Sequence, residues 1–173
     1  MCGKTSHLKG VKTIPLKTNY DNRGSFTEIY RKEWLKNLHP VQWNIVLSKR
    51  KTIRGMRVHK KHTDYVVLFK GSALYVLKDL RQKSKTYMQN CYVKLYGNKM
   101  KYIIIPTGIA HGFYFYEDSG YAYGVDNYYK NSDEIRFNYL DDDCKFKWPS
   151  KKIIMTKRDR MLPPLKKVLN KLT

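Results

Sequence analysis

The feature that most constrains the fold of this chain is a succession of short β-branched and aromatic segments separated by turn residues. Residues 65–69 and 73–77 are two such segments, divided by Lys70-Gly71-Ser72, and residues 102–105 form a third that ends at Pro106. Further strands are expected at residues 25–30, 41–47, 52–59, 87–95, 110–116 and 121–128. This spacing predicts an all-β core of roughly ten strands, arranged as a sandwich or a closed barrel.

Helical signals are scarce and lie at the edges of this pattern. Residues 31–38 could form one short helix, and residues 164–172 carry apolar side chains at helical spacing, which predicts a C-terminal helix. A length of 173 residues suits one domain with its own core. We therefore expect a single domain over residues 1–173, all-β, with a few short peripheral helices.

The charge balance is strongly positive and bears on possible partners. Lysine and arginine number 35 against 14 acidic residues, a net charge of +21 that attracts polyanions. The basic residues are spread along the whole chain without a basic arm or a zinc-finger or RNP motif, so only non-specific attraction to nucleic acid is expected.

Targeting and redox signals favour the cytoplasm. No apolar run is long enough for a membrane span, and residues 1–12 lack the apolar stretch of a signal peptide. The three cysteines are an odd number without metal-site spacing, so we expect reduced thiols. The predicted location is therefore cytoplasmic, with no membrane partner.

A series of short motifs follows in a definite order along residues 9–164. The motifs are residues 21–28 (DNRGSFTE), Gln42 with Asn44, Arg54-Gly55-Met56, Asp79-Leu80-Arg81, residues 106–113 (PTGIAHGF), Tyr123, Asp141, Trp148-Pro149 and Asp159. Together they resemble the dTDP-4-dehydrorhamnose 3,5-epimerase family. The resemblance implies a cupin, that is, a double-stranded β-helix or jelly-roll barrel. It also implies a homodimer in which the N-terminal arm, about residues 1–30 here, reaches the partner's site.

The resemblance also implies a reaction. Members of the family act on 4-keto-6-deoxy nucleotide sugars, in which the C4 ketone acidifies the hydrogens on C3 and C5. A base removes one of these protons, an enolate forms, and an acid returns a proton to the opposite face. By this resemblance the chain is an isomerase or epimerase of deoxysugar and surface-polysaccharide biosynthesis that binds a nucleotide-diphosphate sugar and uses no cofactor.

The residues that match the family's binding positions are spread over the chain. Arg23 and Arg54 resemble the arginines that hold the diphosphate, a task suited to a planar fork of donors. The positions that match the neighbourhood of the nucleotide and sugar are Phe26, Glu28, Gln42, Asn44 and His111. Phe26 could equally be an ordinary core residue, and Glu28 an exposed strand residue.

Two further positions match catalytic groups of the family. Tyr123 resembles the tyrosine that acts as general acid, although it is one of 15 tyrosines. Asp141 resembles the carboxylate that orients the catalytic histidine.

The chain departs from the family at the base itself. Arg57 occupies the position of the catalytic histidine, and Asp64 occupies the position of a lysine. A guanidinium does not lose its proton near neutral pH, so Arg57 cannot be the base. Residues 57 and 59 of a strand point to the same face, so His59 could act as the base while Arg57 stabilises the enolate oxygen. Alternatively, His59 simply fills a polar position in the barrel.

These departures leave several other functions open. The segment around His59 is similar to that of nucleotide-sugar 3,4-ketoisomerases, and loss of the usual base would also suit a catalytically silent binder of sugar nucleotides or glycans. His59, Asp64 and His111 lie near cupin metal positions, and two histidines with a carboxylate could bind a divalent ion. The permanent charge of Arg57 argues against this, so no metal is expected, and His62 is placed at the strand end or pocket rim.

Overall fold

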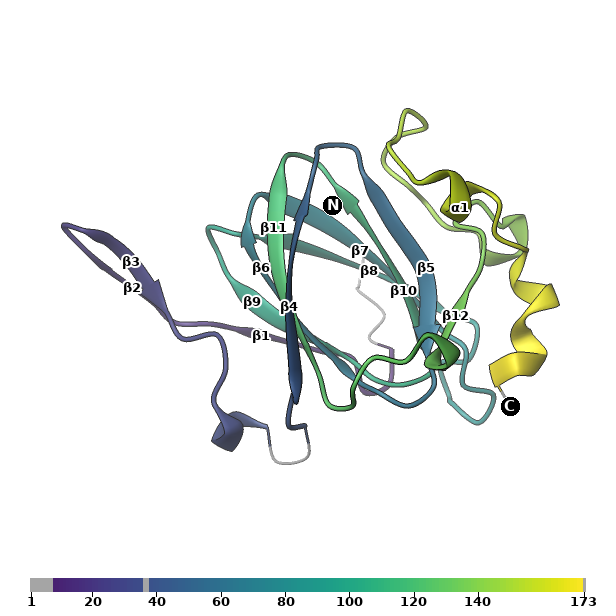
Figure 1. Ribbon diagram of the computed structural model, residues 1–173, viewed down its shortest axis with the longest axis horizontal. Coiled ribbons are helices and arrows are strands. Elements are labelled where there is room, and N and C mark those ends of the chain that lie inside the picture. Colours follow the sequence, from purple (N-terminus) through teal and green to yellow (C-terminus); the bar gives the residue numbers. More distant parts are fainter. Residues whose placement is uncertain (1–7, 36–37, 173) are drawn as a thin grey trace.

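Two five-stranded antiparallel sheets form a barrel-like double layer (Figure 1). The computed structural model describes residues 8–35 and 38–172. In spatial order, one sheet contains β1 (Lys12–Pro15), β9 (Lys101–Ile105), β6 (Asp64–Lys70), β11 (Ser119–Val125) and β4 (Gln42–Ser48). The other contains β12 (Glu134–Arg136), β5 (Ile53–His59), β10 (Ile109–Phe115), β7 (Ser72–Asp79) and β8 (Asn90–Tyr96). The all-β expectation is confirmed.

The remaining elements are short and peripheral. β2 (Thr18–Asp21) and β3 (Gly24–Thr27) form a hairpin that projects from the barrel (Figure 1). The helices are α1 (Lys157–Arg160) and the 3-10 helices η1 (Lys32–Trp34), η2 (Asn131–Asp133), η3 (Asp142–Cys144), η4 (Leu165–Lys167) and η5 (Leu169–Leu172). No helix within residues 8–35 and 38–172 is long and apolar enough to cross a membrane.

Both predicted helices are longer than the helices that the structure contains. The expected helix over residues 164–172 is instead the two short 3-10 helices η4 and η5, which begin just after Pro163-Pro164. Leu165 and Val168 are nevertheless buried, so the apolar spacing correctly marked the face that packs on the barrel. The helix expected over residues 31–38 is reduced to η1, and residues 36–37 lie outside the described part of the chain.

The core is organised by the two-residue period of the strands. On β7, Ala73, Tyr75 and Leu77 pack into the space between the sheets. The alternate residues Leu74 and Val76 pack against the C-terminal segment, which covers the outside of this sheet. This explains why β7 is almost entirely buried, with an apolar rather than an alternating sequence.

A β-bulge on β5 determines which side chains enter the barrel. On the neighbouring strand β10, His111 pairs with Arg57 and Phe113 pairs with Arg54, so three residue steps on β5 oppose two on β10. Gly55 lies in this bulge with a φ of 126°, and a Cβ there would come within 2.6 Å of the Gly112 Cα. The extra residue turns Arg54 to the same side as Arg57 and His59.

The loop after β7 is fixed by the buried carboxylate of Asp79. Its oxygens accept hydrogen bonds from the Arg81 guanidinium at 2.7 and 2.9 Å and from the Ser84 and Thr86 hydroxyls at 2.6 Å each. Burial alone would raise the pKa of Asp79, but these hydrogen bonds outweigh it and hold the pKa below its usual range. The motif Asp79-Leu80-Arg81 is therefore a structural anchor for this loop.

Candidate active site

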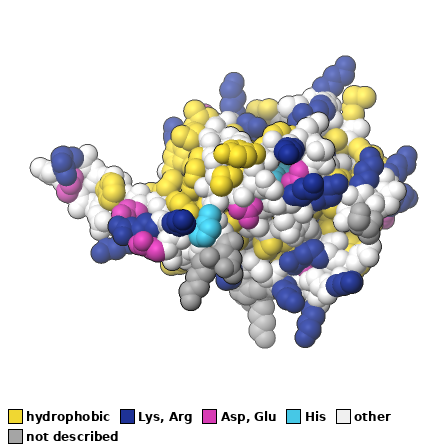
Figure 2. Space-filling view, turned by 60° about the horizontal axis from the view of Figure 1, so that its bottom comes forward, with side chains coloured by type: hydrophobic (Ala, Val, Ile, Leu, Met, Phe, Trp, Pro, Cys, Tyr) yellow, Lys and Arg dark blue, Asp and Glu magenta, His cyan; other side chains and the backbone are white. Residues whose placement is uncertain are grey.

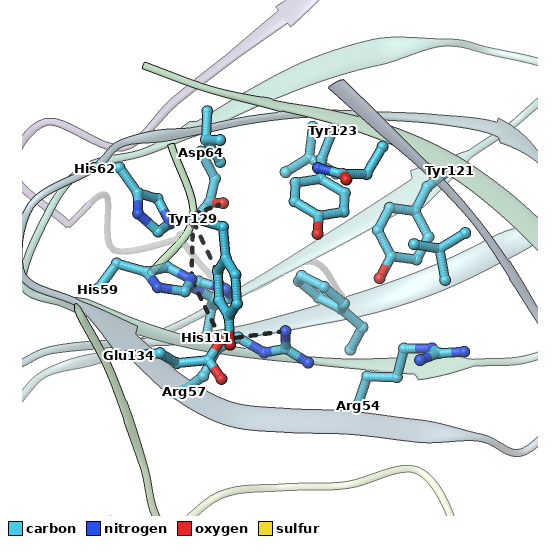
Figure 3. A pocket seen from close by; sticks show the side chains of 15 residues that line it. Arg54, Arg57, His59, His62, Asp64, His111, Tyr121, Tyr123, Tyr129 and Glu134 are labelled. Carbon is cyan, nitrogen blue, oxygen red and sulfur yellow. Dashed lines mark hydrogen bonds and ion pairs between the residues drawn. The ribbon is translucent and has the colours of Figure 1, made fainter. Parts of the chain in front are cut away.

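A pocket lies between the two sheets and receives side chains from both (Figure 3). It is lined by Asn44, Val46, Arg54, Arg57, His59, His62, Asp64, Val66, His111, Phe113, Tyr121, Tyr123, Val125, Tyr129 and Glu134. Arginine, histidine, carboxylate and phenol groups therefore converge on one apolar-walled cavity, the usual composition of a ligand site.

Three histidines surround the carboxylate of Asp64 at the buried end of the pocket. The Asp64 Oδ2 lies 3.6 Å from His59 Nε2 and 3.8 Å from His111 Nε2, and the Asp64 Oδ1 lies 3.9 Å from His62 Nε2. The His59 and His62 rings lie close together at an interplanar angle of 32°, with centroids 3.9 Å apart. We refer to His59, His62 and Asp64 as the histidine–aspartate cluster.

Burial controls the protonation of this end of the pocket. Burial, followed by the nearby His111 and His62, holds the pKa of His59 far below its usual range. Burial and then the charge of Arg57 lower the pKa of His111 to about 3. Burial raises the pKa of Asp64 to about 8, although Arg57 opposes this rise. Both imidazoles are therefore neutral near pH 7, and each keeps one nitrogen lone pair.

Arg57 lies on the wall formed by β5 and β12. Its Nη1 is 3.5 Å from the Glu134 Oε2, and the same carboxylate also contacts Arg136. Behind this wall, Arg57 and Asp159 line a second, very small cavity. The prediction that residues 57 and 59 share a face is confirmed, because both line the pocket.

Two phenols face Arg57 from the opposite sheet. Tyr121 and Tyr123 lie on β11, and their hydroxyl groups point into the pocket (Figure 3). Burial raises the pKa of Tyr121 to about 12 and also raises the pKa of Tyr123, although Arg57 opposes the rise in each case. Both side chains therefore remain protonated at neutral pH and can donate a hydrogen bond or a proton.

The other polar residues of the wall come from β4 and β5. The Arg54 Nε donates to the Ser48 hydroxyl at 2.9 Å, which holds the guanidinium along the pocket wall. Gln42 does not line the pocket itself, but its amide bonds to the Asn44 side chain at 3.2 Å and to the Tyr129 backbone N–H at 3.0 Å. Gln42 therefore positions two residues that do line it.

The predicted binding residues of the N-terminal arm lie apart from this pocket. Arg23, Phe26 and Glu28 belong to the projecting hairpin and the segment after it. Arg23 is paired with Asp21 at 2.7 Å and its side chain is 85% exposed, Phe26 is 65% exposed, and Glu28 pairs with Arg31. None of the three lines the pocket of its own chain.

Asp141 does not orient a pocket histidine. One carboxylate oxygen accepts a hydrogen bond from the Asp143 backbone N–H at 3.0 Å, where it caps η3, and the other accepts from the Leu165 backbone N–H. Asp141 therefore ties the C-terminal segment to the outside of the barrel, and its assignment to the catalytic site is corrected. In the second, very small cavity that Arg57 also lines, the acidic residue is Asp159, which the sequence motif included without a role.

Sequence reasoning missed or undervalued three polar pocket residues. Glu134 and Tyr121 were not singled out, and His62 was placed at the strand end or rim, whereas its side chain is only 2% exposed. The sequence pattern that could have identified His62 is His59-x-x-His62-x-Asp64, which crosses the connection from β5 to β6. No comparable pattern marked Glu134, because β12 pairs with β5 from a distant part of the chain.

Comparison with known proteins agrees with this fold. A family model described as dTDP-4-dehydrorhamnose 3,5-epimerase matches residues 5–167. The enzyme of that name from Salmonella typhimurium is 30% identical over 138 residues, covering 75% of each chain. The one from Methanothermobacter thermautotrophicus is 28% identical over 173 residues, covering 94% of this chain and 93% of the relative.

A solved structure extends the agreement to three dimensions. The Legionella pneumophila dTDP-6-deoxy-D-glucose-3,5-epimerase, in complex with dTDP-4-keto-L-rhamnose, superposes with a TM-score of 0.87 at 26% identity, covering 94% of this chain and 91% of the other. Sequence and structure thus agree over nearly the whole chain. The chain belongs to the dTDP-4-dehydrorhamnose 3,5-epimerase family.

Proposed function

We propose that this protein is an isomerase that removes and returns a proton next to the C4 ketone of a 4-keto-6-deoxy nucleotide sugar. The observation that carries the proposal is the arrangement of the pocket. The protonated phenol of Tyr123 enters from one sheet, while Arg57 and His59 enter from the other. A sugar ring held between them would meet a proton donor on one face and cationic and proton-accepting groups on the other.

The pocket suggests a role for each group. The proton acceptor acts from the histidine–aspartate cluster, where His59 is neutral and has a free lone pair. Arg57 stabilises the developing enolate oxygen, since its charge is permanent and it lines the same wall. Tyr123 delivers a proton to the opposite face. Arg54 binds the diphosphate through its fork of donors.

The free cysteines bear on the cellular location that goes with this proposal. Cys91 and Cys144 are free and buried, which suits a reducing compartment such as the cytoplasm. There the enzyme would contribute to deoxysugar biosynthesis.

Incubation of the protein with dTDP-4-keto-6-deoxyglucose tests the proposal. New sugar diastereomers should appear in the proton NMR spectrum.

A catalytically silent binder is the second candidate, favoured by Arg57 in place of a histidine base. It would bind the nucleotide sugar without producing isomers, and Arg57→His, alone or with Asp64→Lys, would then create an activity that the natural protein lacks. That pair of results would overturn the isomerase assignment.

We also propose a homodimer in which the β2–β3 hairpin lies on the partner. The hairpin projects from its own barrel (Figure 1), and an isolated two-stranded hairpin is only marginally stable in water. On the outer face of β4, Ile45 is 74% exposed and Leu47 is 70% exposed. Figure 2 shows hydrophobic side chains gathered beside the projecting arm. A second copy would cover this face. Phe26 and Arg23 of the first copy's hairpin would then lie near the pocket of the second copy.

Placing charges on this face should separate the two chains. We expect Ile45→Asp with Leu47→Asp to raise the dimer dissociation constant at least about 100-fold, because several large apolar side chains lose their burial. Light scattering after size-exclusion chromatography measures the mass of each species. Leu140→Asp is the matched control, since Leu140 is 62% exposed outside this face. A monomeric natural protein at micromolar concentration would contradict the dimer.

A further inference from the structure

The buried atoms of the histidine–aspartate cluster face one another without hydrogen bonds. Among the described residues, Asp64 Oδ2 has no hydrogen-bond partner, although the Asp64 side chain is only 6% exposed. The separations of 3.6–3.9 Å between the carboxylate and the three Nε2 atoms are too long for hydrogen bonds. Unpaired buried polar atoms are costly, and such a group requires an explanation.

These distances equal or slightly exceed the spacing of donors around a shared cation. Donors about 2.0–2.2 Å from a tetrahedral ion are separated from one another by about 3.3–3.6 Å. The donor atoms of His59, His62 and Asp64 all lie within 4.8 Å of one another. Small side-chain rotations would therefore bring them to ligand distance. Two imidazoles and one carboxylate form a donor set that suits Zn²⁺ or Fe²⁺.

The groups behind the cluster are arranged like the outer shell of a metal site. The His62 Nδ1 lies 2.8 Å from the Asp133 Oδ2, which leaves the His62 Nε2 turned toward Asp64. A carboxylate on the far nitrogen of a histidine fixes the ring and raises its basicity as a ligand. This contact falls outside hydrogen-bond geometry in the present structure, so a small rotation of the ring would complete it.

The surrounding charges also favour a cation despite the presence of Arg57. The Glu134 Oε2 lies 3.9 Å from the His59 Nε2, and the Asp133 carboxylate lies beside His62. Arg57 is drawn toward Glu134, with its Nη1 at 3.5 Å from that carboxylate, and the Glu134 carboxylate is also contacted by Arg136. A divalent ion at the cluster would offset the mutual repulsion of these buried acids.

We propose that His59, His62 and Asp64 bind one divalent transition-metal ion at the buried end of the pocket. Three protein ligands leave a position open for water or a substrate oxygen. The consequence for catalysis rests on the proposed isomerase activity, whereas the metal site itself does not. With the ion bound, His59 would be a ligand and could not accept the sugar proton itself. The ion would instead lower the pKa of a water at the open position, which could take up that proton and leave the electron pair on the sugar as the enolate.

Metal analysis of the full chain, purified without chelators, tests the site. We expect about one ion per chain by mass spectrometry of the elements, or uptake of about one Zn²⁺ by the stripped protein in calorimetry. Cobalt(II) should bind competitively and give the visible absorption of a tetrahedral site. His62→Gln and Asp64→Asn should each weaken Zn²⁺ binding at least about 10-fold, and Asp133→Asn by about 10- to 100-fold.

His39→Gln is the matched control, because His39 is exposed and is not part of the cluster. Circular dichroism and dTDP binding verify that each variant is folded. The site is overturned if the folded natural protein takes up none of Zn²⁺, Fe²⁺, Co²⁺ or Mn²⁺, or if His62→Gln binds Zn²⁺ as tightly as the natural protein. Tyr123→Phe should retain the ion while losing isomerisation, so failure of the metal site and failure of the isomerase proposal give different results.

Discussion

Replacing Tyr123 by phenylalanine is expected to slow the formation of sugar isomers by about 100- to 10,000-fold, the usual contribution of a positioned general acid. The substitution removes one hydroxyl group from a half-buried ring that packs against the core. The raised pKa of Tyr123 keeps this hydroxyl protonated near pH 7. It can therefore return a proton to the face of the enolate opposite the histidine–aspartate cluster.

Isotope exchange distinguishes loss of this acid from general damage to the pocket. In D₂O the proton acceptor of the Tyr123→Phe variant can still remove a proton and return deuterium to the same face. We therefore expect deuterium incorporation with retained configuration to fall much less than isomer formation. Tyr121→Phe is the control on the same strand, and should cost less than about 10-fold if Tyr121 acts mainly through packing. Equal losses of exchange, isomer formation and dTDP binding in Tyr123→Phe would contradict the acid role.

Replacing Asp79 by asparagine should lower the free energy of unfolding by about 3 kcal/mol at pH 7, because it removes a fully buried charge with several partners. The Arg81 guanidinium and the Ser84 and Thr86 hydroxyls all donate to this carboxylate. An amide has only one acceptor oxygen for them. Urea unfolding of the natural protein and the variant measures the difference.

The stability difference should also depend on pH in a defined direction. The pKa of Asp79 in the folded protein lies below the unfolded value of 3.8. Its ionised form therefore stabilises the fold fully above pH 5, and this contribution is lost as the pH falls through the folded pKa. The two proteins should become more similar in acid. Asp142→Asn, at an exposed position, is the control, and equal urea midpoints of Asp79→Asn and the natural protein at pH 7 would contradict the anchor role.

The strand pattern could be predicted from sequence because the strands are short β-branched and aromatic segments bounded by turn residues. Segments such as residues 65–69 and 73–77 fall within β6 and β7. The two 3-10 helices within residues 164–172 could not be predicted, because the apolar spacing indicates a buried face but does not distinguish an α-helix from 3-10 turns. The bulge at Gly55 depends on the close approach of the Gly112 backbone, which is a tertiary contact.

The candidate site could be predicted only in part, because it too depends on tertiary contacts. The common face of Arg57 and His59 follows from strand geometry, and Tyr123 and His111 do line the same pocket. Asp141 was misassigned because a match along the chain does not report which side of the barrel a loop residue meets. Glu134 reaches the pocket only through pairing of β12 with β5, which brings together residues 134 and 59.

Deuterium exchange tests most directly whether this pocket enolises a 4-keto sugar. The natural protein, as isolated, is incubated in D₂O with dTDP-4-keto-6-deoxyglucose and, in parallel, with the corresponding sugars of other nucleotides. Proton NMR then follows the signals of C3–H and C5–H. We expect enzyme-dependent loss of at least one of these signals. Binding of these nucleotide sugars without exchange at either carbon would contradict it.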